Sequence, residues 1–172
     1  MWNYWIIGNK KIIASYTEKG ELQRLCYPEV DGRQFIDYFQ TGVKINDSNL
    51  IYLHQDINNK YSQEYVKNTN ILKTNIENTY FNLKIEQTDF ALIDQNIIVK
   101  KYIFKNNNSV DLDTKFIINS KILSNDLERF GSRIIDKGII QYNHNYAMAI
   151  FSNKNLYGHK LNDVQSTLQS AV

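Results

Sequence analysis

Hydrophobic and polar residues alternate with a period of two in several apolar stretches of this chain. Near the N-terminus, Ile12, Ala14 and Tyr16 occupy one set of alternate positions, and Ile13 and Ser15 occupy the other. Because successive side chains of a strand point to opposite faces, this period is typical of a strand with one buried face. The alternation therefore predicts a chain built mainly from β-strands.

The best-defined element of this pattern is a β-hairpin within residues 5–28. Residues 17–20 form its turn, where Gly20 is free to adopt a positive φ. The second strand contains Leu22 and Leu25 and ends before Pro28, because proline cannot donate a hydrogen bond to a sheet ladder. The chain is therefore expected to begin with antiparallel strands.

Further strand signals recur about every ten residues, and turn residues separate them. Residues 29–34 are expected to form a polar loop, residues 35–39 an irregular apolar stretch, and residues 77–78 a turn. The other strands are expected within residues 42–45, 50–53, 61–67, 71–76, 80–87, 96–105, 112–118, 134–142 (a hairpin through Lys137 and Gly138) and 147–151.

The order of these elements favours an all-β fold. A fold that alternates strands and helices needs helical periods between its strands, and none occurs before residue 161. From there, Leu161, Val164, Leu168 and Ala171 share one helical face. We therefore predict an antiparallel β-sandwich with a short C-terminal helix, in a single domain that covers residues 1–172.

The composition is that of an ordinary globular protein, with 42% hydrophobic and 22% charged residues. The net charge of +2 is too small to indicate a nucleic-acid partner. No apolar run approaches the roughly 20 residues of a membrane span, so no membrane partner is expected. Because the N-terminus also lacks the pattern of a signal peptide, we expect a cytoplasmic protein.

Aromatic residues make up 13% of the chain, which reflects either strand propensity or a platform for a ligand. Trp2, Tyr4 and Trp5 cluster at the N-terminus, where they could pack in a core, pack between domains or stack on a sugar. The single cysteine, Cys26, is expected to be a buried structural thiol. The pair Lys100 and Lys101 is expected on a solvated face.

The residues that could carry chemistry are scattered. Pairs of acidic residues two positions apart border turns, where carboxylates are usually solvated or capping, so we expect no catalytic pair; they are Glu29 and Asp31, Asp111 and Asp113, and Asp126 and Glu128. The three histidines, His54, His144 and His159, are too far apart for a ligand spacing. We therefore expect no catalytic residue, no metal and no cofactor in this chain.

Several motifs resemble one family. The Gly8-Asn9 pair, the apolar strand, the Lys19-Gly20 turn and the closing Leu25-x-Tyr27-Pro28 resemble the opening of the N-terminal β-sandwich of prokaryotic glucoamylase-like enzymes, in glycoside hydrolase family 15. Asn70-Ile71-Leu72-Lys73-Thr74 and Asp89-Phe90 continue the resemblance in the same order, which becomes looser beyond Asn119. The resemblance implies a supersandwich of the galactose-mutarotase-like type, incomplete at its C-terminus in this chain.

The resemblance also implies a function. In that family an (α/α)6-barrel after the sandwich holds both catalytic carboxylates, so the parent would hydrolyse α-glucosidic bonds with inversion, and this chain would be its non-catalytic domain. The expected partners are the barrel of the same polypeptide and an α-glucan oligosaccharide, although trehalose- and dextran-acting members leave the substrate open. The alternative is a free-standing carbohydrate-binding or protein-interaction β-sandwich.

One region is expected to reach the absent barrel. Residues 27–39 form an irregular loop that contains apolar residues and Arg33, and loops on rigid scaffolds often carry contacts. With Trp5, this gives a candidate substrate-binding or interdomain rim of Trp5, Tyr27 and Arg33. The alternative is an ordinary loop packed on the sandwich.

Overall fold

The computed structural model of the protein describes residues 4–28, 32–123, 131–143 and 146–160. Every element of regular secondary structure in these residues is a β-strand, which confirms the all-β prediction for this part of the chain. The helix expected over residues 161–171 lies outside the described residues. No helix that could cross a membrane occurs among the described residues.

The strands, in chain order, are β1 (Trp5–Gly8), β2 (Ile13–Tyr16), β3 (Leu22–Cys26), β4 (Ile36–Ile45), β5 (Ile51–Tyr52), β6 (Asn59–Tyr65), β7 (Ile71–Asn78), β8 (Leu83–Ala91), β9 (Ile98–Asn106), β10 (Thr114–Ile122), β11 (Gly131–Ile135), β12 (Gly138–Tyr142) and β13 (Ala147–Phe151). The chain divides into two compact units, Met1–Ser120 and Lys121–Val172. The single domain expected over residues 1–172 stays a prediction.

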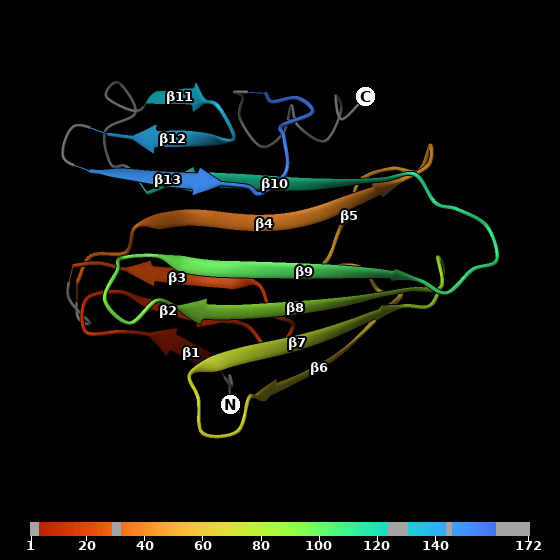
Figure 1. Ribbon diagram of the computed structural model, residues 1–172, viewed down its shortest axis with the longest axis horizontal. Coiled ribbons are helices and arrows are strands. Elements are labelled where there is room, and N and C mark those ends of the chain that lie inside the picture. The colour runs from red at the N-terminus through yellow and green to blue at the C-terminus, as the bar shows by residue number, and fades with distance from the viewer. Residues whose placement is uncertain (1–3, 29–31, 124–130, 144–145, 161–172) are drawn as a thin grey trace. The chain divides into compact units, whose positions relative to one another are not determined.

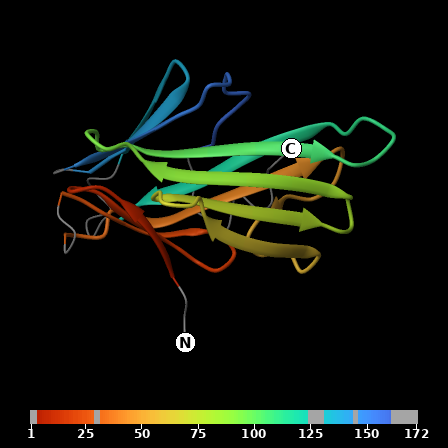
Figure 2. The same cartoon turned by 60° about the horizontal axis from the view of Figure 1, so that its bottom comes forward.

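The first unit is an antiparallel β-sandwich. One sheet has the order β1-β2-β3-β4-β10, with the short β5 paired to β4, and the other has the order β6-β7-β8-β9. Figure 1 shows the second sheet in front of β1, β2 and β3, and Figure 2 shows the same layers from another side. The second unit contains a separate sheet of β11, β12 and β13.

The hairpins expected from the sequence are confirmed. In the first, Ala14 pairs with Leu25. Its turn contains Gly20 at a φ of 87°, and the Oγ1 atom of Thr17 accepts a hydrogen bond from the backbone N–H of Glu21 at 3.2 Å. The second hairpin joins β4 to β5 and the third joins β11 to β12. The expected strand over residues 147–151 is β13, which pairs with β12.

Several strand boundaries differ by a few residues from the sequence-based prediction, and two of the differences have a visible cause. The stretch 35–39 is not irregular, because β4 begins at Ile36. The buried residues Ile36 and Phe39 are three positions apart, so the alternation changes phase there and hides the strand. The turn expected at residues 77–78 comes later, because β7 continues through Asn78, whose Oδ1 accepts a hydrogen bond from the N–H of Phe81 at 2.8 Å.

The inner face of the second sheet changes character along its strands. One end is apolar and packs into a buried cluster that contains Val43, Ile45, Leu53, Ile76, Leu83 and Ile85. At the other end the aligned residues are polar: Thr74, Gln87 and Tyr102 form one row across β7, β8 and β9. Asp89 and Lys100 pair directly in the next row. The sandwich therefore encloses a group of polar side chains.

Candidate functional site

The enclosed polar group is assembled from segments that lie far apart in the sequence. Gln87 and Asp89 alternate with outward residues on β8, so both point inward, where they are fully buried. Lys100 lies opposite Asp89 on β9. His54 follows β5, and Gly20 contributes its carbonyl group from the turn between β2 and β3. We call these five residues the interior polar cluster.

Gln87 lies at the centre of the cluster. Its Nε2 atom donates to the carbonyl oxygen of Gly20 at 2.8 Å and to Oδ2 of Asp89 at 2.6 Å. Both partners only accept hydrogen bonds, which fixes the orientation of the amide. Oε1 of Gln87 therefore faces Nε2 of His54 at 3.1 Å, and that ring nitrogen must carry the proton that it donates.

His54 is held neutral in this surrounding. Burial is the main cause, and together with the positive charge of Lys100 it lowers the pKa of the imidazole to about 3, although the hydrogen bond with Gln87 acts in the opposite direction. Because a charged imidazole would lie in a dehydrated interior near an ammonium group, the neutral form is the stable one. His54 is therefore a hydrogen-bond donor here and not a charge.

Lys100 forms a buried ion pair, although the sequence predicted a solvated side chain. Its Nζ atom donates to Oδ1 of Asp89 at 2.5 Å, and only 12% of its side-chain surface is exposed. Nζ also lies 4.6 Å from the ring centroid of Tyr16 and 5.8 Å from that of Tyr102. Burial lowers the pKa of Lys100, but attraction to Asp89, with Tyr102 and Tyr16, outweighs it and raises the pKa above its ordinary value.

Tyr16 completes the wall beside Lys100. Its side chain is fully buried, and its hydroxyl makes no hydrogen bond of ordinary geometry within the described residues. Burial raises the pKa of the Tyr16 hydroxyl, although the charge of Lys100 opposes the change. The phenol is therefore neutral and contributes an aromatic face and not a reactive oxygen.

The cluster links the two sheets of the sandwich. Each of its charged or polar groups faces another member, and the bond from Gln87 to Gly20 joins β8 to the β2–β3 turn. A Cβ atom added to Gly20 would lie 2.8 Å from Cγ2 of Thr74, so the turn rests directly on β7. The cluster therefore fixes how the two sheets lie against each other. Its polar groups bind one another inside the protein.

The three residues of the expected rim have different neighbourhoods. The half-buried ring of Trp5 lies 5.0 Å from that of Tyr65, centroid to centroid. The ring of Tyr27 lies 5.8 Å from that of Phe35. The Tyr27 hydroxyl also accepts a hydrogen bond from Nδ2 of Asn96 at 3.0 Å. Arg33 is exposed. The role of these residues at a rim stays a prediction.

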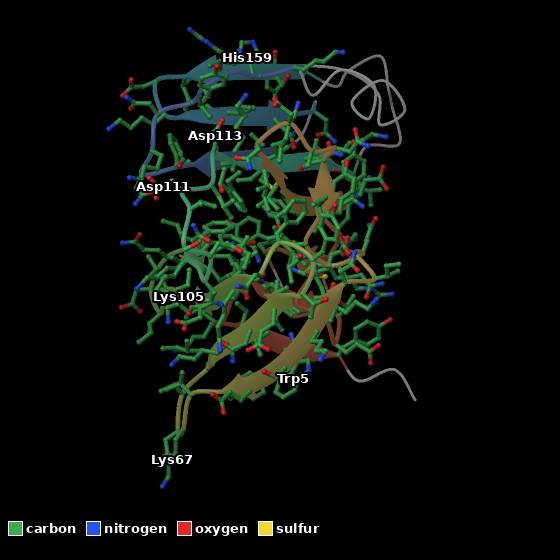
Figure 3. The ribbon with its side chains drawn as sticks, turned by 90° about the vertical axis from the view of Figure 1, so that its right-hand side faces the viewer. Trp5, Lys67, Lys105, Asp111, Asp113 and His159 are labelled. Atoms are coloured by element: carbon green, nitrogen blue, oxygen red, sulfur yellow. The ribbon has the colours of Figure 1, made fainter. Side chains whose placement is uncertain are left out.

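The other residues that the sequence singled out are dispersed. Cys26 is half-buried and not fully buried, with Sγ 3.9 Å from Oε1 of Gln34. Asp111 and Asp113 are exposed in the connection before β10 (Figure 3). His159 is exposed in the second unit. Tyr4 is exposed. Glu29, Asp31, Asp126, Glu128, His144 and Trp2 lie outside the described residues.

Metal-binding geometry is not found in the described part of the chain, where no three His, Cys, Asp or Glu residues are grouped to hold an ion.

A surface depression lies beside the first strand. It has a volume of about 380 Å³ and is lined by Ile6, Ile7, Gly8, Asn9, Ile13, Tyr65, Thr69 and Asn70. The Tyr65 hydroxyl accepts a hydrogen bond from the N–H of Ile6 at 2.8 Å and donates one to its carbonyl at 2.7 Å. Nδ2 of Asn70 donates to the carbonyl of Gly8 at 2.7 Å. The sequence indicated Trp5 but not Tyr65, because alternation within a strand does not reveal that Tyr65 binds Ile6, which lies 59 positions away in the chain.

Comparison with known proteins gives one match. Over 153 residues, which are 88% of this chain, the sequence is 28% identical to a protein of Methanocaldococcus jannaschii that is named as an uncharacterized glycosyl hydrolase. The chain spans 24% of the length of that protein, about a quarter. No family model matches the chain. No solved structure is detectably similar to it.

Proposed function

We propose that this chain is a non-catalytic β-sandwich of a glycoside hydrolase that acts on α-glucosidic bonds, where it supports the catalytic domain. The observation that carries the proposal is the coverage of the match. The similarity extends over 88% of this chain but 24% of a protein named as a glycosyl hydrolase. Most of that relative therefore lies beyond the matched segment and leaves ample length for a separate catalytic domain.

The arrangement of the carboxylates supports a scaffold role. Glycoside hydrolysis commonly uses two carboxyl groups on either side of the scissile bond, one of them an acid and the other a base or nucleophile. The buried carboxylate of Asp89 is bound by Lys100 and Gln87, inside the sandwich. Asp111 and Asp113 lie in a single exposed connection. The interior polar cluster thus uses its charge to join strands.

The choice of α-glucosidic bonds rests on the sequence resemblance carried by Gly8-Asn9, Lys19-Gly20 and the closing Tyr27-Pro28. In an inverting reaction of that kind, one carboxylic acid protonates the leaving oxygen and a carboxylate activates water on the opposite face of the sugar. In this proposal both groups belong to the catalytic domain. The sandwich holds that domain and shapes the approach to it.

The test compares the 172-residue chain with the natural polypeptide that contains it. We expect the 172-residue chain to release no glucose from maltotetraose, and the longer polypeptide to release it with inverted anomeric configuration, followed by NMR. Turnover by the 172-residue chain above the buffer rate contradicts the proposal. Failure of the longer polypeptide to hydrolyse maltotetraose, isomaltotetraose or trehalose contradicts it as well.

The second candidate function is a free-standing carbohydrate-binding or protein-interaction sandwich. The observation that favours it is the pairing of Trp5 with the partly exposed Tyr65 beside a surface depression. A natural reading frame that encodes no catalytic domain after this segment favours the free-standing sandwich. A reading frame that encodes a catalytic domain there favours the non-catalytic domain of a glycoside hydrolase.

A further inference from the structure

The depression beside β1 contains an aromatic side chain held in one position. Tyr65 is 40% exposed, and its hydroxyl is bound to both backbone groups of Ile6. One side of its ring packs against Trp5, with an angle of 58° between the two planes. Because the ring is fixed before any ligand arrives, a molecule that stacks on it does not have to order it first.

The polar groups of the depression are fixed as well. Both ends of the Asn9 amide are engaged, because Nδ2 donates to the carbonyls of Leu92 and Gln95 while Oδ1 accepts from the N–H groups of Lys11 and Ile12. Thr69 accepts from Ile71 and donates to Val66 through its hydroxyl. These hydrogen bonds hold the side chains of Asn9 and Thr69 in fixed positions along the depression.

Asn70 differs from the other polar lining residues. Its Nδ2 is anchored on the carbonyl of Gly8, and its Oδ1 atom accepts no hydrogen bond within the described residues, so this oxygen is available as an oriented acceptor. The residue is exposed, so a ligand can reach this atom from solvent. A donor group of a ligand that lies on the Tyr65 ring would therefore find an acceptor in a fixed place.

The charge of the lining restricts the kind of ligand. The eight lining residues are all uncharged. Lys67, at the tip of the β6–β7 connection, extends away from the body of the unit, as Figure 3 shows. A phosphate or carboxylate would find no cation in this lining, whereas a neutral sugar offers an apolar ring face and hydroxyl donors. The volume of about 380 Å³ lies near the low end for ligand sites and suits a short stretch of sugar.

We propose that this depression binds a neutral oligosaccharide, with a pyranose ring on the face of Tyr65 and a sugar hydroxyl donating to Oδ1 of Asn70. The choice of an α-linked glucan as the sugar rests on the proposed function. The site is open and presents one ring and one oriented acceptor, so we expect weak binding, with a dissociation constant of about 1 mM.

The test is an NMR titration of the 172-residue chain with maltotetraose, and in parallel with cellotetraose. We expect saturable shifts at Trp5, Tyr65 and Asn70. Tyr65→Ala should weaken binding by about tenfold, because stacking on the ring is lost. Asn70→Ala should weaken it about threefold to tenfold, because one hydrogen bond is lost. Each variant is checked for folding by its amide spectrum.

The matched control is Tyr80→Ala. Tyr80 is also an exposed aromatic residue, at 74% exposure, and it packs on a neighbouring ring with centroids 4.7 Å apart. It lies outside the depression, so its removal should leave binding unchanged. Asn70→Ala keeps the test decisive if Tyr65→Ala fails to fold, because Asn70 is an exposed turn residue.

Two results overturn the proposal: no saturable shift with either sugar up to tens of millimolar, or equal weakening by Tyr80→Ala and Tyr65→Ala. A preference for cellotetraose overturns the α-glucan assignment. Because the titration needs no catalytic domain, it fails or succeeds independently of hydrolysis by the longer polypeptide. Loss of binding with retained hydrolysis rejects this site alone, and binding without hydrolysis rejects the proposed function alone.

Discussion

Gln87 on β8 donates a hydrogen bond to the carbonyl oxygen of Gly20, a residue 67 positions earlier in the chain, at 2.8 Å. The bond joins the second sheet of the sandwich to a turn of the first. Gln87 also contacts His54 and Asp89, so one amide serves three partners. The stability of the sandwich should therefore depend strongly on this side chain.

Replacement of Gln87 by Leu should lower the free energy of unfolding by about 2–4 kcal/mol, because the change leaves several buried polar groups without partners. Urea denaturation of the 172-residue chain measures the effect. Gln55→Leu is the matched control, because Gln55 is exposed, and it should change stability by less than about 0.5 kcal/mol. Equal effects of the two substitutions would contradict the central role of Gln87.

The ion pair between Lys100 and Asp89 should be costly to break from one side. Lys100→Met should destabilise the protein by about 3–5 kcal/mol, since it leaves a buried carboxylate without its cation. The double variant Lys100→Met/Asp89→Leu should lose less. Lys84→Met removes an exposed ion pair with Glu77 and should cost at most about 1 kcal/mol. A double variant less stable than either single variant would contradict this account.

The neutral state of His54 predicts a pH dependence. Its pKa is about 3 in the folded protein against 6.5 in the unfolded chain, so the unfolded chain takes up the proton first as the pH falls. Stability should therefore decrease from about pH 6.5 toward pH 3, by up to about 1.4 kcal/mol per pH unit from this group.

The test is urea unfolding at several pH values between 7 and 4. His54→Gln keeps a donor toward Gln87 but does not titrate, so its profile should be flatter than that of the wild-type protein. His159→Gln makes the same substitution at an exposed position and should change stability at pH 7 by less than about 0.5 kcal/mol. Parallel profiles for the wild-type protein and His54→Gln would show that another group causes the loss of stability at acidic pH.

The turn at Gly20 should not tolerate a side chain. Its φ of 87° is unfavourable for other residues, and a Cβ atom would lie 2.8 Å from both Cγ2 and Oγ1 of Thr74. Gly20→Ala should therefore destabilise the protein by more than about 1 kcal/mol, measured by thermal unfolding. Gly158→Ala, where the added atom meets nothing within 4 Å, is the control. A neutral Gly20→Ala would mean that the turn can shift away from β7.

Much of the strand order could be read from the sequence, because alternation and turn residues are local signals. The first hairpin followed from Ala14, Tyr16 and Gly20. The start of β4 was missed where Ile36 and Phe39 break the alternation. Within the second sheet the pattern located β8 and β9 but could not give the pairing of their residues.

The interior polar cluster was hidden for a different reason. Gln87, Asp89 and Lys100 are polar, and a reading by hydrophobicity places such residues on the solvated face. The inward direction of Gln87 and Asp89 follows from the continued alternation after Leu83 and Ile85, which the sequence does contain. Their partners could not be found this way, because Gly20 and His54 come from distant turns. A charged side chain such as Lys100 is buried only when it has a partner of opposite charge, and this partner is brought to it by the folding of the chain.

The bonds that Tyr65 and Asn70 make with Ile6 and Gly8 have a consequence for the behaviour of the protein in concentrated solution. An outermost strand with free N–H and C=O groups recruits strands from neighbouring molecules, which is a common route to fibrils. Along β1, side chains of the same molecule already occupy the groups of Ile6 and the carbonyl of Gly8. This margin of the sandwich is therefore protected against self-association without a charged gatekeeper residue.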